Sequence, residues 1–299
     1  MRGLDPDRLA KSQPVDLLAE RLRALSTGAI SLTVAAAPNP GWAQSIFGAP
    51  DLGRLWHAVA VATRLNEPDP VASWREHLAA LAGRRDLLNE RRFDRVRLRG
   101  PGTDIVVGLS PRSRWSTAEQ ITATGRTFVI NLPTEEVFTS PDWRRADGRV
   151  RTTAPFVLPV MNALVEGLEL ELASGAIVSA RAARGEAQVQ AQLDAVPRSR
   201  HLGELAIVDG GSRVRSTGVL FRDILFDENA GCHLAWGQGF AFCFDGAVAM
   251  TAQERIDAGL NQSPVHVDIV VGGPDVEVDG LDATGQASAI VRADEFVLS

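Results

Sequence analysis

The chain has 299 residues, of which 45% are hydrophobic and 23% are charged, and its formal net charge is −6. This composition is typical of a globular protein, and the even spread of charge along the chain argues against nucleic-acid and membrane partners. The longest early apolar run, residues 30–37, is far shorter than the roughly 20 residues that a membrane span needs. The two cysteines, Cys232 and Cys243, are too few for a disulfide framework, so we expect reduced thiols and a cytoplasmic protein.

The first third of the chain is predicted to be mostly helical. Apolar residues recur at helical spacing in Asp16–Leu25, Pro40–Phe47 and Leu52–Leu65, and another helix is expected to start at Asn66–Pro70. One short strand is expected, at Ile30–Val34. A single strand is a thin basis for a sheet, so this region is interpreted as helical α/β material.

The chain becomes richer in predicted strands after residue 92. Polar and apolar residues alternate in residues 93–109 around a Gly-Pro-Gly turn, and residues 167–183 predict a hairpin that turns at Ser174 and Gly175. The other predicted elements are strands at Arg126–Leu132 and Leu205–Val208 and helices at Glu186–Leu193 and Phe221–Ala235. The sequence therefore predicts an α+β fold, in which a strand-rich, mixed-sheet domain at residues 93–299 follows a helical region at residues 1–92.

The stretch from Asn261 to Gly273 contains a pair of candidate metal ligands. Its β-branched residues, followed by two glycines, predict a buried strand. Alternate side chains of a strand share a face, so His266 and Asp268 point the same way, roughly 6.6 Å apart along the backbone. The two side chains either converge on one cation or are a satisfied core histidine beside a polar aspartate.

Three other segments, residues 131–141, 202–208 and 225–237, place carboxylates or imidazoles beside apolar residues. Burying a charge is costly unless it is paired or bound to a metal, so these side chains are further candidate ligands. Each also has a structural interpretation. Glu204 could lie on an exposed edge strand, Glu136 could cap a helix, and His233 could be a satisfied core histidine.

Together these segments resemble a known family. The motifs that carry the resemblance are, in chain order, NLPTEEVFTSPD, LGELAIV, GVLFRDILFDENAGCH, NQSPVHVDIVVGG and VDGLDATG. They resemble the thermophilic aminopeptidases of the aminopeptidase T and aminopeptidase S type, and the resemblance extends over nearly the whole chain from about Asp16. It implies a metal-dependent exopeptidase with a two-metal site, a peptide substrate and a homodimer.

The resemblance also implies which residues bind the metals. The glutamate of the family's PTEEVFT motif falls on Glu136, that of its GELA motif on Glu204, and the histidine after its DENA segment on His233. The histidine and aspartate of its HxD strand fall on His266 and Asp268. Two imidazoles and three carboxylates suit two divalent ions such as Zn²⁺, Co²⁺ or Mn²⁺.

Two departures from the family pattern bear on activity. The family has a tyrosine seven residues after the histidine of the DENA segment, and the resemblance implies that its hydroxyl stabilises the tetrahedral intermediate. This chain has Phe240 at that position and contains no tyrosine. Loss of such a donor costs about 10²–10³ in rate. The family also carries more α/β domain ahead of the point where this chain begins, so residues 1–92 are expected to be a shortened amino-terminal domain.

The leading hypothesis is a dinuclear metallo-aminopeptidase that releases amino-terminal residues from short peptides. The alternative, motivated by Phe240 and the shortened region, is a degenerate family member that binds metal but has little or no peptidase activity. A protein without any metal would require five matching ligands to be accidental. Glu135, next to Glu136, is a catalytic candidate that would handle protons or support the metal ligands; otherwise it is a solvent-exposed neighbour.

Overall fold

The computed structural model describes residue 24, residues 28–159 and residues 161–299. Eight strands, each antiparallel to its neighbours, form the larger sheet. In spatial order they are β12 (Ala176–Arg181), β11 (Glu169–Ala173), β8 (Ala146–Arg151), β3 (Thr103–Gly108), β2 (Arg95–Gly100), β16 (Glu277–Leu281), β17 (Ala287–Arg292) and β18 (Glu295–Phe296). The predicted α+β class is therefore confirmed.

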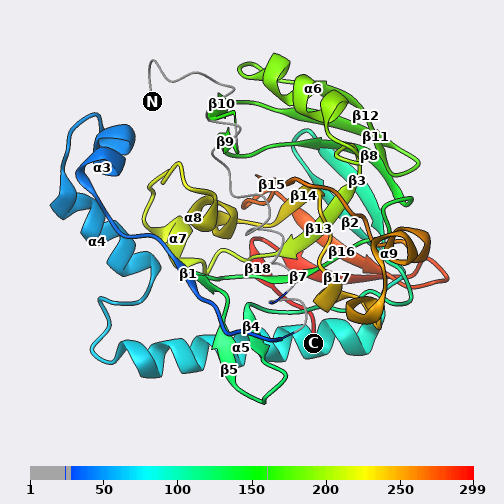
Figure 1. Ribbon diagram of the computed structural model, residues 1–299, viewed down its shortest axis with the longest axis horizontal. Helices are drawn as coiled ribbons and strands as arrows, with labels where there is room; N and C mark the ends of the chain where they lie inside the picture. Colours follow the sequence, from blue (N-terminus) through cyan, green and yellow to red (C-terminus); the bar gives the residue numbers. More distant parts are fainter. Residues whose placement is uncertain (1–23, 25–27, 160) are drawn as a thin grey trace.

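A second sheet of four antiparallel strands lies in the middle of the molecule (Figure 1). Its strands, in spatial order, are β15 (His266–Val270), β14 (His233–Gly237), β13 (Leu202–Ile207) and β7 (Val137–Thr139). We call it the site sheet. Three strand pairs complete the described sheet structure: β1 (Val34–Ala35) with β6 (Asn131–Leu132), β4 (Glu119–Ile121) with β5 (Thr127–Val129), and β9 (Phe156–Leu158) with β10 (Ala163–Val165).

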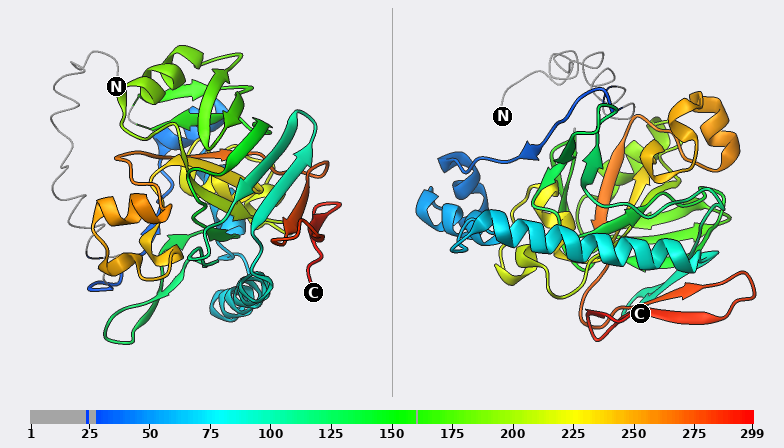
Figure 2. Two further views of the ribbon diagram at one scale, coloured as in Figure 1. Left: turned by 90° about the vertical axis from the view of Figure 1, so that its right-hand side faces the viewer. Right: turned by 90° about the horizontal axis from the view of Figure 1, so that it is seen from below.

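The helices lie outside these sheets. They are α3 (Pro40–Phe47), α4 (Leu52–Ala62), α5 (Pro70–Arg91), α6 (Glu186–Ala195), α7 (Arg213–Ser216), α8 (Ile224–Asp227) and α9 (Ala252–Ala258), with 3₁₀ turns η1 (Glu228–Ala230), η2 (Ala241–Cys243) and η3 (Ala247–Ala249). The long helix α5 runs beneath the sheets (Figure 2). Among the described residues, no helix has the length and apolar character needed to cross a membrane.

The main hydrophobic core lies between the larger sheet and the site sheet. Leu98 and Ile105 reach it from the larger sheet, and Leu205, Leu234 and Ile269 reach it from the site sheet. The last three stand opposite one another across β13, β14 and β15, so they form one row on the core face. One face of the site sheet is therefore apolar and packed, and the other is free to carry polar groups.

The helices of the amino-terminal region begin where the sequence predicts. Asn39, Asp51 and Asp69 cap α3, α4 and α5, and each side-chain oxygen accepts a hydrogen bond of 2.9–3.0 Å from the backbone N–H three residues later. Pro40 and Pro70 occupy the first helical positions, where a missing N–H costs nothing. The helix α5 adds Leu81 and Leu88 to the main core, whereas α3 and α4 pack in a separate apolar cluster with Phe221 and Phe226.

Most elements predicted after residue 92 are present. The two hairpins form β2–β3 and β11–β12, and the predicted helix near residue 186 is α6. The strand predicted at Arg126–Leu132 is divided between β5 and β6, and the one predicted at Ile30–Val34 is reduced to Val34–Ala35. The helix predicted at Asp16–Leu25 lies outside the described residues except for Ala24. Both cysteines are free and buried, as expected.

The helix predicted over Phe221–Ala235 is confirmed only in its middle, around residues 227–229, and is wrong at its carboxyl end. The segment contains the short helices α8 and η1, turns through an extended Gly231, and continues as the strand β14. Leu234 and Trp236 face the core, so this part follows the two-residue period of a strand. Pairing with β13 on one side and β15 on the other decided the outcome, because the local sequence fits a helix and a strand almost equally well.

Truncating the core row should destabilise the protein far more than the same change at the surface. We expect Leu205→Ala to lower the free energy of unfolding by about 2–5 kcal/mol, because it leaves a cavity at a fully buried position. Leu65→Ala is the matched control, since Leu65 is 56% exposed, and it should change stability by less than about 0.5 kcal/mol. Urea unfolding of both variants measures the difference, and equal losses would contradict the assigned core face.

Candidate metal centre

The register of the site sheet places the predicted ligands on one face. Ala235 on β14 stands opposite Glu204 on β13 and opposite Asp268 on β15, so these carboxylates point to the same side. His233 is two residues before Ala235 and shares its face. Ala206 stands opposite His233. The two alanines leave room between the polar side chains.

The remaining two residues reach this face from the outer strands. Ala206 also stands opposite Phe138 on β7, so Glu136, two residues earlier, projects toward the same side. His266 lies two residues before Asp268 on β15 and stands opposite Gly237. All five predicted ligands therefore line one cavity.

A β-bulge turns Glu204 toward this cavity. The register of β13 shifts between Leu202 and Glu204, which places Gly203 as an extra residue. Without the bulge, Leu202 and Glu204 would share a face, but Leu202 lies in the main core and Glu204 lines the cavity. Only glycine fits at the bulge, because a Cβ on Gly203 would lie 2.2 Å from the carbonyl oxygen of Gln238.

The ligand atoms form two groups that share one residue. Glu136, Glu204 and His233 form the first, and Glu204, His266 and Asp268 form the second; within each group the atoms lie within 4.8 Å of one another. Nε2 of His233 is 3.0 Å from Oε2 of Glu136. Nε2 of His266 is 2.9 Å from Oε2 of Glu204 and 3.1 Å from Oδ1 of Asp268.

Both imidazoles turn Nε2 toward carboxylates. Nδ1 of His233 lies 3.2 Å from the carbonyl oxygen of Gly231, and Nδ1 of His266 lies 2.8 Å from that of Gln238. A proton on Nδ1 can be donated to these carbonyls, which leaves the Nε2 lone pair of a neutral imidazole facing a carboxylate. That arrangement is repulsive unless a proton or a cation lies between the two groups.

The pKa values reflect this crowding. Burial, followed by the charges of Glu136 and Asp268, raises the pKa of Glu204 to about 7 despite the opposing effect of His266. Burial alone would lower the pKa of His233, but the carboxylates around it, Glu136 foremost, raise it to about 9. The pKa of His266 is likewise raised by Asp268 and Glu204 against the effect of burial. The cluster therefore retains protons at neutral pH when no cation is present.

The cavity holds a fourth carboxylate that our sequence analysis did not assign. It has a volume of about 1000 Å³, and Glu228 of η1 lines it beside the five predicted residues. Burial and the charges of Asp268 and Glu136 raise the pKa of Glu228 well above its ordinary value. The DENA motif that contains Glu228 could have indicated this residue. The helix predicted for the segment did not show which of its side chains point into the cavity.

Several phenylalanines line part of the cavity wall near the candidate ligands. The wall contains Phe138, Phe240 and Phe242. The Phe240 ring stacks on Phe242, with centroids 5.2 Å apart, and lies 4.8 Å from the His266 ring. Phe240 therefore stands beside the ligands, at the position where the resemblance implies a tyrosine.

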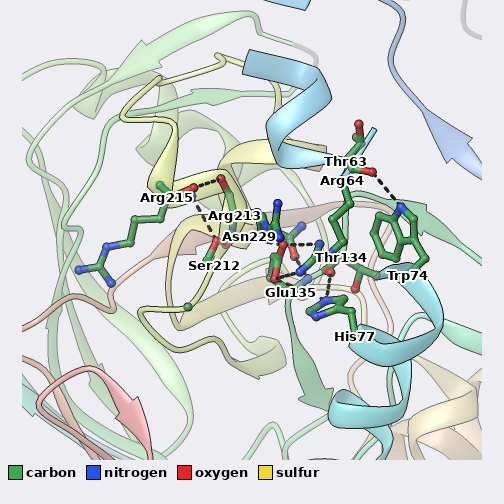
Figure 3. A network of polar contacts seen from close by, with 12 residues as sticks. Thr63, Arg64, Trp74, His77, Thr134, Glu135, Ser212, Arg213, Arg215 and Asn229 are labelled. Atoms are coloured by element: carbon green, nitrogen blue, oxygen red, sulfur yellow. Dashed lines mark hydrogen bonds and ion pairs between the residues drawn. The ribbon is translucent and has the colours of Figure 1, made fainter. Parts of the chain in front are cut away.

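Glu135 points away from the cavity and does not line it. Arg64 pairs with both of its carboxylate oxygens, at 2.7 and 3.0 Å (Figure 3). The alternative interpretation of Glu135, a solvent-exposed neighbour, is wrong, because the residue is 4% exposed. Its geometry supports a place behind Glu136 and gives it no direct access to the reacting groups. Sequence reasoning could not find Arg64, since no local pattern distinguishes it.

The structural alternatives for two of the candidate ligands, Glu204 and Glu136, are also wrong. Glu204 is buried on a strand with neighbours on both sides, so it is no edge-strand surface residue. Glu136 immediately precedes the strand β7 and caps no helix.

Comparison with known proteins assigns the family. The family model described as thermophilic metalloprotease (M29) matches residues 1–296. The chain belongs to the M29 family of thermophilic metalloproteases. Aminopeptidase T of Thermus aquaticus is 38% identical over 304 residues, which cover 100% of this chain and 74% of that protein. Aminopeptidase AmpS of Bacillus subtilis is 34% identical over 298 residues, covering 98% of this chain and 72% of that protein.

A solved structure supports the same assignment for the fold. Wild-type AmpT from Thermus thermophilus superposes with a TM-score of 0.89 and 35% identity, covering 99% of this chain and 73% of that one. The resemblance to thermophilic aminopeptidases inferred from the motifs is thereby confirmed. Membership of the M29 family implies a divalent metal cofactor, and the two groups that share Glu204 are the candidate place for it.

The raised pKa of Glu204 predicts that the metal-free protein becomes less stable as the pH rises. The unfolded chain releases this proton near pH 4.5 and the folded protein near pH 7, so between these values the folded state holds more protons and its free energy of unfolding decreases. The expected loss is on the order of 1–3 kcal/mol, and Glu204→Gln should remove it. Urea unfolding in the presence of EDTA, from pH 4.5 to 7, should show a shallower decline for this variant than for the wild type.

The exposed strand residue Glu171 offers a matched control. Glu171→Gln removes a carboxylate of the same kind from β11 and should leave the pH dependence of the wild type unchanged. A Glu204→Gln variant whose stability declines as steeply as that of Glu171→Gln would contradict the burial of an uncompensated charge.

Proposed function

We propose that this chain is a metal-dependent aminopeptidase with a two-ion centre. The observation that carries the proposal is the pair of ligand groups that share Glu204 within one cavity. Glu136, Glu204 and His233 would hold one ion, and Glu204, His266 and Asp268 would hold the other. Glu204 would then bridge the two ions, and Glu228 is available as a sixth polar group.

The carboxylates of the cavity have few partners among the described residues, and divalent cations would supply the missing ones. Oε2 of Glu136 is buried and, although it lies 3.0 Å from Nε2 of His233, no described donor makes a well-aligned hydrogen bond to it. In the described part of the chain, the ion pairs of Glu136, Glu204 and Asp268 are made with histidines alone. Arg255 also lines the cavity, but its guanidinium binds the Ala247 carbonyl and Gln262. Imidazole nitrogens with carboxylate oxygens suit Zn²⁺, Co²⁺ or Mn²⁺.

The rest of the cavity suits the amino-terminal end of a peptide. Bound divalent cations supply Lewis acidity, which polarises a peptide carbonyl and lowers the pKa of water. The carboxylates attract the ammonium group of a free amino terminus, and Glu228 belongs to neither ligand group, so it can accept a hydrogen bond from that ammonium. The phenylalanines of the wall receive an apolar side chain and exclude water from the bond to be cleaved.

A second candidate function follows from Phe240. Its ring stands 4.8 Å from the His266 ring but offers no hydroxyl to stabilise an oxyanion. The same constellation could then bind metal and peptide with little turnover. Metal binding and catalysis therefore need separate measurements.

Metal should stabilise the protein through this centre. We expect Zn²⁺ or Co²⁺ at about 100 times its dissociation constant to raise the melting temperature of EDTA-treated protein by roughly 5–10 °C, because the ions bind the folded state alone. His266→Ala should abolish most of this rise. His57→Ala, which removes an exposed histidine of α4, is the control and should preserve it. Scanning calorimetry gives the shifts, and identical metal responses in both variants would refute the proposed centre.

Hydrolysis of amino-acid 4-nitroanilides by Co²⁺-loaded protein tests the catalytic part of the proposal, and Phe240→Tyr sharpens that test. The variant restores an O–H donor beside the cluster and should raise kcat by one to three orders of magnitude, with a smaller change in KM. Phe242→Tyr adds a hydroxyl to the neighbouring ring of the same wall and serves as the control, with no comparable gain expected. A Phe240→Tyr variant that binds two ions and still cleaves no leucyl, methionyl or arginyl substrate would favour the metal-binding, non-catalytic alternative.

A further inference from the structure

Arg64 is a buried arginine whose guanidinium is fully committed to one carboxylate. It follows α4 in the left-handed backbone conformation, with φ of 58°, and pairs with both oxygens of Glu135 (Figure 3). The two side chains are 5% and 3% exposed. The Trp74 ring lies 4.9 Å from the guanidinium carbon and is itself fixed by a 2.8 Å hydrogen bond from Nε1 to the carbonyl of Thr63.

The surroundings of Glu135 leave Arg64 as its main counter-charge. Nε2 of His77 lies 3.4 Å from Oε2 of Glu135 and 2.8 Å from the carbonyl oxygen of Thr134. Burial lowers the pKa of His77 despite the opposing effect of Glu135, so this imidazole adds little positive charge at pH 7. The backbone N–H of Arg213 donates to Oε1 of Glu135 at 3.3 Å. Loss of Arg64 would therefore leave a buried carboxylate without a cation, which forces the carboxylate to move or to take up a proton.

Asn229 links this ion pair to a second segment of the cavity wall. Its side-chain oxygen accepts a 2.7 Å hydrogen bond from the backbone N–H of Glu135, and its Nδ2 donates to the carbonyl of Leu225 at 3.0 Å. Ser212 donates to the Asn229 carbonyl at 2.6 Å. Asn229 is completely buried.

Each anchored residue is the sequence neighbour of a carboxylate in the cavity. Glu135 precedes Glu136, and Asn229 follows Glu228. Glu136 and Glu228 line the cavity, whereas Glu135 and Asn229 belong to the network behind it. Hydrogen bonds that hold Glu135 and Asn229 in place therefore also hold the backbone from which Glu136 and Glu228 project.

We propose that Arg64 is a positioning residue for the metal centre: by holding Glu135 it sets the direction of Glu136 and, through Asn229, that of Glu228. The inference rests on the proposed function of the cavity as a metal site. Arginine suits this role better than lysine, because its planar fork binds two oxygens at once and packs on an aromatic ring. Groups that orient metal ligands from behind typically contribute 10–100-fold to metal affinity or activity.

The experiment compares two arginine-to-lysine changes in EDTA-treated protein, at a temperature well below the melting point. Arg64→Lys tests the proposal. Arg145→Lys is the control, because Arg145 makes a similar two-oxygen pair with Asp94, at 2.9 and 2.7 Å, and does not line the cavity. Calorimetric titration with Co²⁺ gives the affinity, the visible absorption of bound Co²⁺ reports ligand geometry, and melting curves report stability.

We expect both variants to melt at lower temperature, but only Arg64→Lys to bind Co²⁺ about 10–100-fold more weakly with an altered spectrum. If Arg64→Lys retains activity, its kcat should fall by a larger factor than its KM rises. Wild-type affinity and spectrum in Arg64→Lys would mean that Arg64 only ties the helices to the sheets, and the inference would be wrong while the metal site stood. A wild-type protein that binds no Co²⁺ would overturn both proposals.

A second variant covers the case in which Arg64→Lys does not fold. Glu135→Gln keeps the size of the side chain and one acceptor for Arg64 but removes the charge. We expect it to weaken Co²⁺ binding about tenfold relative to Arg145→Lys. Unchanged binding in Glu135→Gln would overturn the inference without reference to the first variant.

Discussion

The rest of the structure depends on the crowding of four carboxylates and two imidazoles around one cavity. Buried charges of one sign repel, and each costs several kcal/mol to remove from water unless something compensates it. In the metal-free protein, protons provide part of the compensation, since the pKa of Glu204 is raised to about 7 and that of His233 to about 9. Divalent cations would displace these protons, so the arrangement that is costly in the free protein suits the bound one.

The two faces of the site sheet differ in polarity: one packs in the main core, and the other presents the crowded carboxylates to the cavity. Leu205 and Ile269 fill the main core, and their neighbours Glu204 and Asp268 turn to the cavity. The same alternation continues outside the sheet, where Glu136 faces the cavity and Glu135 pairs with Arg64 behind it. Adjacent residues thus belong to different layers, the cavity wall and the packed or hydrogen-bonded layer behind it.

The sequence predicts the fold class and the local placement of His266 and Asp268, because a strand's alternation depends only on neighbouring residues. The convergence of His266 with Glu136 and His233 depends on register across the sheet, which local patterns do not encode. The resemblance to the family identified Glu136 and His233 as candidate ligands, which the periodicity of the sequence could not do. The end of the helix predicted over Phe221–Ala235 is wrong for the same reason, since β14 forms only between β13 and β15.

Two features lay beyond any local reading of the sequence. Glu204 reaches the cavity through a bulge at Gly203, and a bulge changes the face of every residue that follows it. Arg64 lies 71 positions before Glu135, in a loop whose composition carries no signal of a buried pair. Both depend on tertiary contacts that satisfy a buried polar group, and such contacts become visible only when the chain is folded.

Under the proposed function, Phe240 would affect catalysis and leave cation binding unchanged. It precedes η2 on a segment that contributes none of the six polar groups, and its backbone N–H is fixed by Ser140 at 2.8 Å. Its ring packs against Phe138, Phe242 and His266, so the position is well defined without a hydroxyl. The arrangement of the candidate ligands does not depend on this residue, because the register of the site sheet and the hydrogen bonds of Glu135 behind Glu136 fix it. Under the proposed function, the difference between a peptidase and a binding protein on this scaffold would therefore rest on one O–H donor at position 240.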